Sequence, residues 1–121
     1  YTDFEVSNES LLKQQLSKDE VIEISFDLKN MGSMQGSEVV QLYIRKNDEA
    51  QDNPIKILKA FERVFLAEGE KQRITLSVPT KELARYDPEL GKFTVVTGSY
   101  DLMVGNSSTN FYFTKTLEII E

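Results

Sequence analysis

Acidic side chains are the residues of this sequence whose type and spacing could support catalysis. Asp48, Glu49 and Asp52 lie in one long polar loop, and Asp87 and Glu89 flank the proline of YDPELG. Glycoside hydrolysis needs only two carboxylates at a suitable separation. Because nothing apolar near either group would raise a carboxyl pKa, we interpret both as solvated loop acids. The sequence therefore predicts no catalytic residue.

The same polar loop could also offer oxygen ligands to a calcium ion. Asp48, Glu49, Asp52 and Asn53 have the right chemistry, but their spacing does not match an EF-hand loop. The chain has no His and no Cys, so it cannot form a Ser-His-Asp or Cys-His arrangement or the usual zinc site. Its glycines are widely spaced and form neither a dinucleotide fingerprint nor a phosphate loop. We expect no metal ion and no cofactor.

Length and charge restrict the class of protein. The chain has 121 residues, which is the usual size of one domain with one core. Its 14 Lys and Arg are scattered among 20 Asp and Glu, giving a net charge of -6 that excludes nucleic acid and anionic membranes as partners. No apolar run approaches the length of a membrane span. The chain begins at Tyr1 without a leader-like segment, so we expect a piece of a longer protein.

Alternation of apolar and polar residues predicts β-strands along most of the chain. VIEISFDLKN, KQRITLSVP and SYDLMVG each place every second apolar residue on one face, and YTDFEVSN and NFYFTKTLEII supply a first and a last strand. Gly and Asn residues occupy the breaks between these runs. We expect an all-β fold, an antiparallel β-sandwich of about seven strands. TKELARYD is expected to add one helical turn capped by Thr80, and Tyr100 or Tyr86 could form a tyrosine corner.

The run GSEVVQLYIRK, residues 36–46, has apolar residues on both of its faces. Val40, Leu42 and Ile44 share one parity, whereas Val39 and Tyr43 share the other. The next strand, LKAFERVFL, is ambiguous as well, because its leucines and Val64 alternate out of phase with its two phenylalanines. A bulge near Phe61 and Glu62 would let both sets be buried.

Aromatic residues could form a platform on which sugar rings stack. Such a platform requires several rings that are coplanar and exposed, and the chain has no Trp, the residue best suited to this role. We favour core or interface packing over sugar binding. The candidate members are Tyr43, Phe61, Phe65, Phe111, Tyr112 and Phe113.

Four ordered motifs resemble a known domain: GSEVVQLYIR, PIKILKAFERVFLAEGE, ELARYD and TGSYDLMVGNSS. They closely resemble the fibronectin type III-like domain at the C-terminus of glycoside hydrolase family 3 enzymes, the β-glucosidases and β-xylosidases. The resemblance covers essentially the whole chain, so residues 1–121 are interpreted as one such domain, with its immunoglobulin-like or fibronectin type III-like sandwich. Ala60 departs from the family, which often has Gly there, and disfavours a positive φ at this point.

The resemblance implies a non-catalytic accessory domain, because the catalytic carboxylates of these enzymes belong to the preceding domains. The implied partners are the catalytic domains of the same parent chain, a β-glucosidase, and a periplasmic or secreted location would follow. We expect Val39, Tyr43, Phe61 and Phe65 to form the docking surface that those domains cover. Two alternatives remain: LKAFERVFL folds back over this face within the chain, or exposed aromatics make weak contact with carbohydrate.

Overall fold

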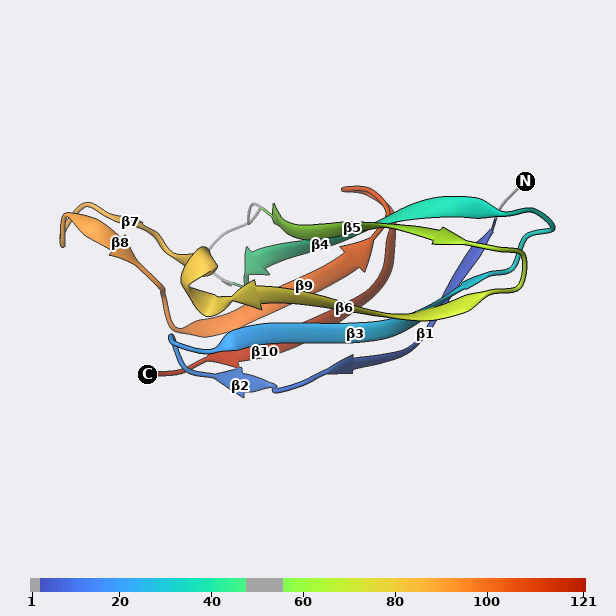
Figure 1. Ribbon diagram of the computed structural model, residues 1–121. Coiled ribbons are helices and arrows are strands. Elements are labelled where there is room, and N and C mark those ends of the chain that lie inside the picture. Colours follow the sequence, from blue (N-terminus) through green and yellow to red (C-terminus); the bar gives the residue numbers. More distant parts are fainter. Residues whose placement is uncertain (1–2, 48–55) are drawn as a thin grey trace.

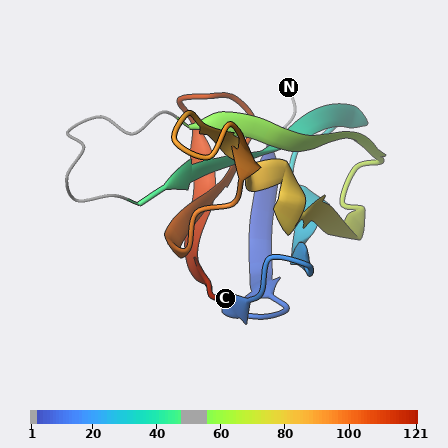
Figure 2. The same cartoon turned by 90° about the vertical axis from the view of Figure 1, so that its left-hand side faces the viewer.

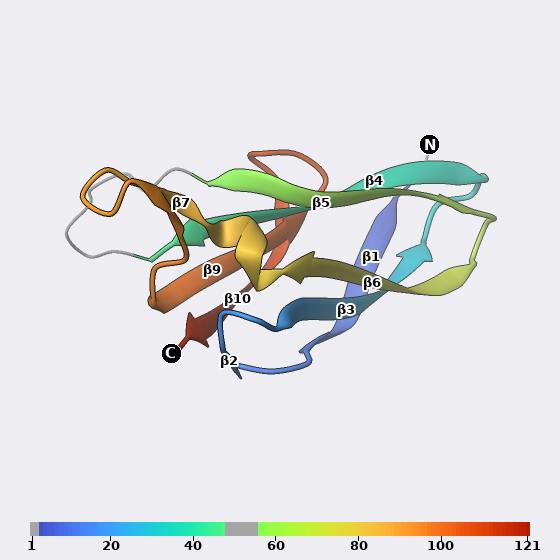
Figure 3. The same ribbon diagram turned by 60° about the vertical axis from the view of Figure 1, so that its left-hand side comes forward.

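The computed structural model describes residues 3–47 and 56–121. Two sheets pack face to face, one with the strand order β1-β3-β6 and the other with the order β2-β10-β9-β4-β5 (Figures 1 and 3). The strands are β1 (Phe4–Leu11), β2 (Gln15–Leu16), β3 (Val21–Asn30), β4 (Gly36–Lys46), β5 (Ile57–Leu66), β6 (Lys71–Pro79), β7 (Arg85–Asp87), β8 (Lys92–Thr94), β9 (Gly98–Gly105) and β10 (Phe111–Ile119), with a 3-10 turn η1 (Thr80–Leu83).

The expected all-β sandwich is confirmed, with ten strands among the described residues rather than about seven. The three unexpected strands are short, because β2 has two residues and β7 and β8 have three each. β7 and β8 form a separate hairpin, which extends beyond one end of the sandwich and faces the viewer in Figure 2. At this hairpin the rings of Tyr86 and Phe93 meet edge to face, 5.5 Å apart, and both are exposed.

The core lies between the two sheets and is built from the alternating positions of the longer strands. β3 directs Ile22, Ile24, Phe26 and Leu28 inward, and all four are fully buried. The ring of Phe26 meets that of Phe113 on β10 edge to face, with centroids 5.6 Å apart. Burying each such side chain stabilises the fold by about 1.5–3 kcal/mol. The residues that the alternation predicts to face inward are therefore the ones that pack between the two sheets.

Asn30, at the end of β3, is fully buried and has a complete set of hydrogen bonds. Its Nδ2 donates to the carbonyl oxygens of Met34 at 2.8 Å and Leu66 at 3.1 Å, and its Oδ1 accepts from the backbone N–H of Gly32 at 2.9 Å. Asn30 does not adopt a positive φ. The turn is held instead by the Asn30 amide, which joins the β3–β4 connection to the end of β5.

Two further expectations have definite outcomes. Thr80 was expected to cap the helical turn, and this prediction is wrong: Pro79 precedes the turn, and the buried hydroxyl of Thr80 lies 2.6 Å from the carbonyl oxygen of Lys18, to which it donates. Tyr100 forms the tyrosine corner, because its hydroxyl donates to the carbonyl oxygen of Val96 at 2.6 Å. Burial raises the pKa of Tyr100. The hydrogen bonds of the Thr80 hydroxyl join the turn to the segment before β3.

Candidate docking surface

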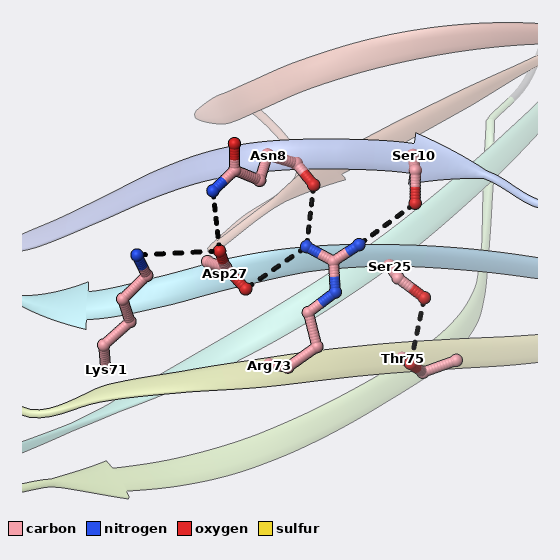
Figure 4. A network of polar contacts seen from close by, with 7 residues as sticks. All are labelled: Asn8, Ser10, Ser25, Asp27, Lys71, Arg73 and Thr75. Carbon is pink, nitrogen blue, oxygen red and sulfur yellow. Dashed lines mark hydrogen bonds and ion pairs between the residues drawn. The ribbon is translucent and has the colours of Figure 1, made fainter.

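The outward face of the three-stranded sheet carries a network of hydrogen bonds and ion pairs around Asp27 (Figure 4). Asp27 on β3 lies at its centre, where its Oδ2 accepts from the Asn8 amide at 2.8 Å and its Oδ1 lies 3.2 Å from Nη1 of Arg73. Lys71 lies 3.7 Å from the same carboxylate, and Nη2 of Arg73 donates to the Ser10 hydroxyl at 3.1 Å. Three strands contribute to this network. A partner would gain little by covering it.

The Asp27 network makes stability depend on pH. The hydrogen bond from Asn8, followed by Arg73 and Lys71, holds the pKa of Asp27 below its usual value of 3.8. A depressed carboxyl pKa contributes stability that is present above the unfolded pKa and is lost as the pH falls through the folded one. We therefore expect the melting temperature of the chain to decrease as the pH is lowered below about 4. The decrease should be less steep in Asp27→Asn.

A melting curve series in constant ionic strength measures this effect. The matched control is Glu23→Gln on the same strand, since the Glu23 carboxylate has no ion pair or hydrogen bond among residues 3–47 and 56–121. If Asp27→Asn and Glu23→Gln show the same acid limb as the unmodified chain, the network has no part in the pH dependence.

The outward face of the five-stranded sheet is apolar over much of its area. Strand pairing places Phe61 opposite Gln41, Leu58 opposite Tyr43, and Tyr43 in turn opposite Met103 of β9. On β10, Phe111 lies opposite Gly105 and its ring meets that of Tyr43 edge to face at 5.9 Å. The apolar outer face, as we name this surface, consists of Val39, Tyr43, Leu58, Phe61, Phe65, Met103 and Phe111.

The structure brings the four predicted docking residues to this one face. Phe61 and Phe65 are 69% and 63% exposed, while Val39 and Tyr43 are half-buried by their neighbours. β5 pairs with β4 edge to edge in the same sheet, as Figure 3 shows, so the alternative in which LKAFERVFL folds back over β4 is wrong. The exposure of Phe61 and Phe65 means that the rest of the described chain does not cover these two rings. The side chains of Phe61 and Phe65 therefore face outward.

A bulge in β5 explains the ambiguous pattern of this strand. Ala60 pairs with Leu42 and Leu58 pairs with Tyr43, so Lys59 is an extra residue. The bulge thus lies before Phe61, not at Phe61 and Glu62 as predicted, and it does not bury the phenylalanines. It turns Leu58, which is 42% exposed, onto the apolar outer face. The Lys59 ammonium donates to the carbonyl oxygen of Glu82 at 2.7 Å.

The aromatic residues do not form a flat platform. The rings of Tyr43 and Phe111 are inclined at 84° to each other, and Phe113 points inward against Phe26. Tyr112 directs its hydroxyl to the Glu38 carboxylate, to which it donates at 2.5 Å. Burial, followed by the Glu38 carboxylate, raises the pKa of Tyr112. Four of the six candidate members of the sugar-stacking platform lie on the apolar outer face: Tyr43, Phe61, Phe65 and Phe111. The rings of Tyr43 and Phe111, which contact each other, are not coplanar.

The polar border of the apolar outer face was not expected from the sequence. Asp101 on β9 is buried, and its carboxylate accepts from Nε of Arg45 at 3.0 Å and from the Thr116 hydroxyl at 3.1 Å. Asn47 completes the group at 3.5 Å. Arg45, Asp101 and Thr116 come from β4, β9 and β10, Asn47 directly follows β4, and only the strand register reveals that they meet.

Of the acidic residues considered as catalytic or calcium-binding candidates, only those near Pro88 lie among the described residues. Asp87 is the last residue of β7, and its Oδ1 accepts a hydrogen bond from the backbone N–H of Glu89 at 2.9 Å in the turn that follows, which is a structural role. Asp48, Glu49, Asp52 and Asn53 lie outside the described residues. Within residues 3–47 and 56–121, no group of three or more His, Cys, Asp and Glu side chains could hold a metal ion. That part of the chain also has no helix long and apolar enough to cross a membrane.

Comparison with known proteins agrees with the fold and with the motif order. The family model described as "Fibronectin type III-like domain" matches residues 38–108. The chain is 33% identical over 119 residues to thermostable beta-glucosidase B of Acetivibrio thermocellus, covering 98% of this chain and 16% of that protein. A crystal structure of a beta-glucosidase from Kluyveromyces marxianus superposes with a TM-score of 0.87 at 35% identity, covering 100% of this chain and 15% of that one.

A crystal structure of a beta-glucosidase from Listeria innocua superposes with a TM-score of 0.86 at 28% identity, covering 98% of this chain and 16% of that one. The chain thus spans about a sixth of the length of the relatives it matches. Fold, matched residues and relatives agree: the chain belongs to the fibronectin type III-like domain family, and its relatives are family 3 β-glucosidases.

Proposed function

We propose that this chain is a non-catalytic accessory domain of a family 3 β-glucosidase, and that it packs against the catalytic domains of its own parent chain through the apolar outer face. The observation that carries the proposal is the difference between the two outward faces of the sandwich. One face is occupied by ion pairs around Asp27, whereas the other exposes Phe61 and Phe65. An apolar patch of this kind is typical of a surface that a partner covers.

The energy available from covering this face is sufficient to matter. A buried aromatic side chain removes about 150–250 Å² from water, and more than half of Phe61 and Phe65 is still exposed. At about 25 cal/mol per Å², covering these two rings would contribute on the order of 5 kcal/mol. Domain interfaces within one chain bury about 600–1,500 Å², which the neighbouring apolar residues would help to supply.

The relatives favour a partner within the same chain. In the Acetivibrio thermocellus enzyme the matched region is 16% of the protein, so most of that β-glucosidase lies outside it. Carbohydrate contact is a weaker proposal, because the rings of Tyr43 and Phe111 on this face are not coplanar and the chain has no Trp.

The test uses the full-length parent hydrolase carrying Phe61→Ser and Phe65→Ser together. We expect loss of interdomain contact, seen as a lower melting temperature of the catalytic domains and faster proteolytic release of this domain. Phe93→Ser is the matched control, since Phe93 is also 69% exposed but lies on the β7–β8 hairpin. An unchanged melting profile and unchanged proteolysis in the double variant would contradict the proposal. Retention on insoluble glucans that the double variant loses would favour carbohydrate contact instead.

A further inference from the structure

Two charged side chains lie among the aromatic residues of the apolar outer face: Lys56, whose ammonium is 5.8 Å from the centroid of the Phe111 ring, and Arg63. Arg63 lies on β5 between Phe61 and Phe65, shares their parity and pairs with Val39 of β4. It is exposed, and its guanidinium makes no hydrogen bond or ion pair with any residue of 3–47 or 56–121. Glu62 is adjacent in sequence but takes the opposite parity, opposite the buried Val40, so it cannot act as the partner.

Two other arginines of the sandwich have carboxylate partners within the chain. Arg45 lies 3.0 Å from Asp101, and Arg73 lies 3.2 Å from Asp27. Within residues 3–47 and 56–121, Arg63 therefore has no carboxylate partner, and it lies beside two exposed phenylalanines. Covering an unpaired guanidinium with apolar atoms would be strongly unfavourable, because the charge would lose its water and gain nothing in return.

A carboxylate is the group best suited to neutralise and hydrogen-bond the buried Arg63 guanidinium. The guanidinium offers a planar set of donors that matches the two oxygens of a carboxylate, and the pair is neutral overall. Burial between Phe61 and Phe65 would exclude water from such a pair and hold its geometry. Removal of either partner would then leave one buried charge unpaired.

This inference rests on the proposed docking function and adds the chemistry of the partner. We infer that the surface covering the apolar outer face belongs to the parent chain outside residues 1–121 and presents an Asp or Glu carboxylate to Arg63, surrounded by apolar side chains. The carboxylate fixes the position of the domain on its partner, while the phenylalanines supply the buried area. A purely apolar partner surface would not accommodate Arg63.

Zero-length cross-linking of the full-length parent hydrolase tests this directly. In Arg63→Lys, a water-soluble carbodiimide should join the introduced amine to the partner carboxylate as an amide, and the carbodiimide takes up the water that is lost. We expect mass spectrometry to find one cross-linked Asp or Glu outside residues 1–121, with a yield about tenfold above that of Arg85→Lys. Arg85 is the matched control because it is exposed, lies on the β7–β8 hairpin and has no ion pair among the described residues.

A charge reversal separates failure of this inference from failure of the docking proposal. Arg63→Glu should speed proteolytic release of the domain from the full-length enzyme, and Arg63→Met should do so less, because it retains the apolar stem. The partner carboxylate is overturned if Arg63→Lys gives no cross-link above the control and the domain of Arg63→Glu is released no faster than normal. Docking through the apolar outer face still stands in that case if proteolysis releases the domain faster in the Phe61→Ser, Phe65→Ser variant. If that variant is retained too, docking itself fails. A cross-link between two copies of the chain would overturn the choice of partner.

Discussion

Phe26→Ala is expected to lower the free energy of unfolding of the chain by about 3–5 kcal/mol. Phe26 is fully buried at the centre of β3, between the two sheets, and its ring contacts that of Phe113. The substitution removes the transfer energy of the ring and leaves a cavity that two paired strands, β1 and β6, prevent from closing. Urea denaturation followed by tyrosine fluorescence gives the midpoint and the slope.

Phe93→Ala provides the comparison for this substitution. It deletes the same atoms from a side chain that is mostly exposed on the hairpin, so its free energy of unfolding should change by less than about 0.5 kcal/mol. Equal losses in the two variants would show that the inter-sheet core does not hold Phe26 as the structure describes.

Asn30→Ala is expected to cost about 2–4 kcal/mol, although it removes only an amide. The substitution leaves the carbonyl oxygen of Leu66 and the N–H of Gly32 without their side-chain partner. Each buried group left unsatisfied costs about 1–3 kcal/mol. The same denaturation experiment measures the loss, and hydrogen exchange should show faster opening at the start of β4.

Asn110→Ala is the corresponding control, because the Asn110 amide donates to Asn106 in an exposed turn. Its loss should stay within about 0.5 kcal/mol. If Asn30→Ala is equally mild, water replaces the Asn30 amide at no cost and the connection before β4 does not depend on it.

The long strands could be predicted from the sequence because one of their faces is buried. Alternation in VIEISFDLKN leaves a single register that buries Phe26 and its neighbours, and β3 follows it throughout. β2, β7 and β8 are too short to show a period, so nothing local indicated them. The role of Thr80 was missed because its partner, the Lys18 carbonyl, is distant in sequence.

The candidate docking surface could be predicted only in part. Parity placed Val39 with Tyr43, and the structure brings Phe61 and Phe65 to the same face. Met103 and Phe111 were not predicted as members, since their position depends on which strands pair and in which register. The isolation of Arg63 is likewise invisible in the sequence, where Glu62 stands beside it.

The extra residue at Lys59 has a consequence for how such a domain can evolve. Insertion of one amino acid reverses the side on which every earlier residue of the strand projects, and the residues after it keep theirs. Val64 and Leu66 thus continue to fill the interior, while Leu58 becomes available for contact. A single added codon in an edge strand can enlarge a recognition surface without a compensating change elsewhere in the protein.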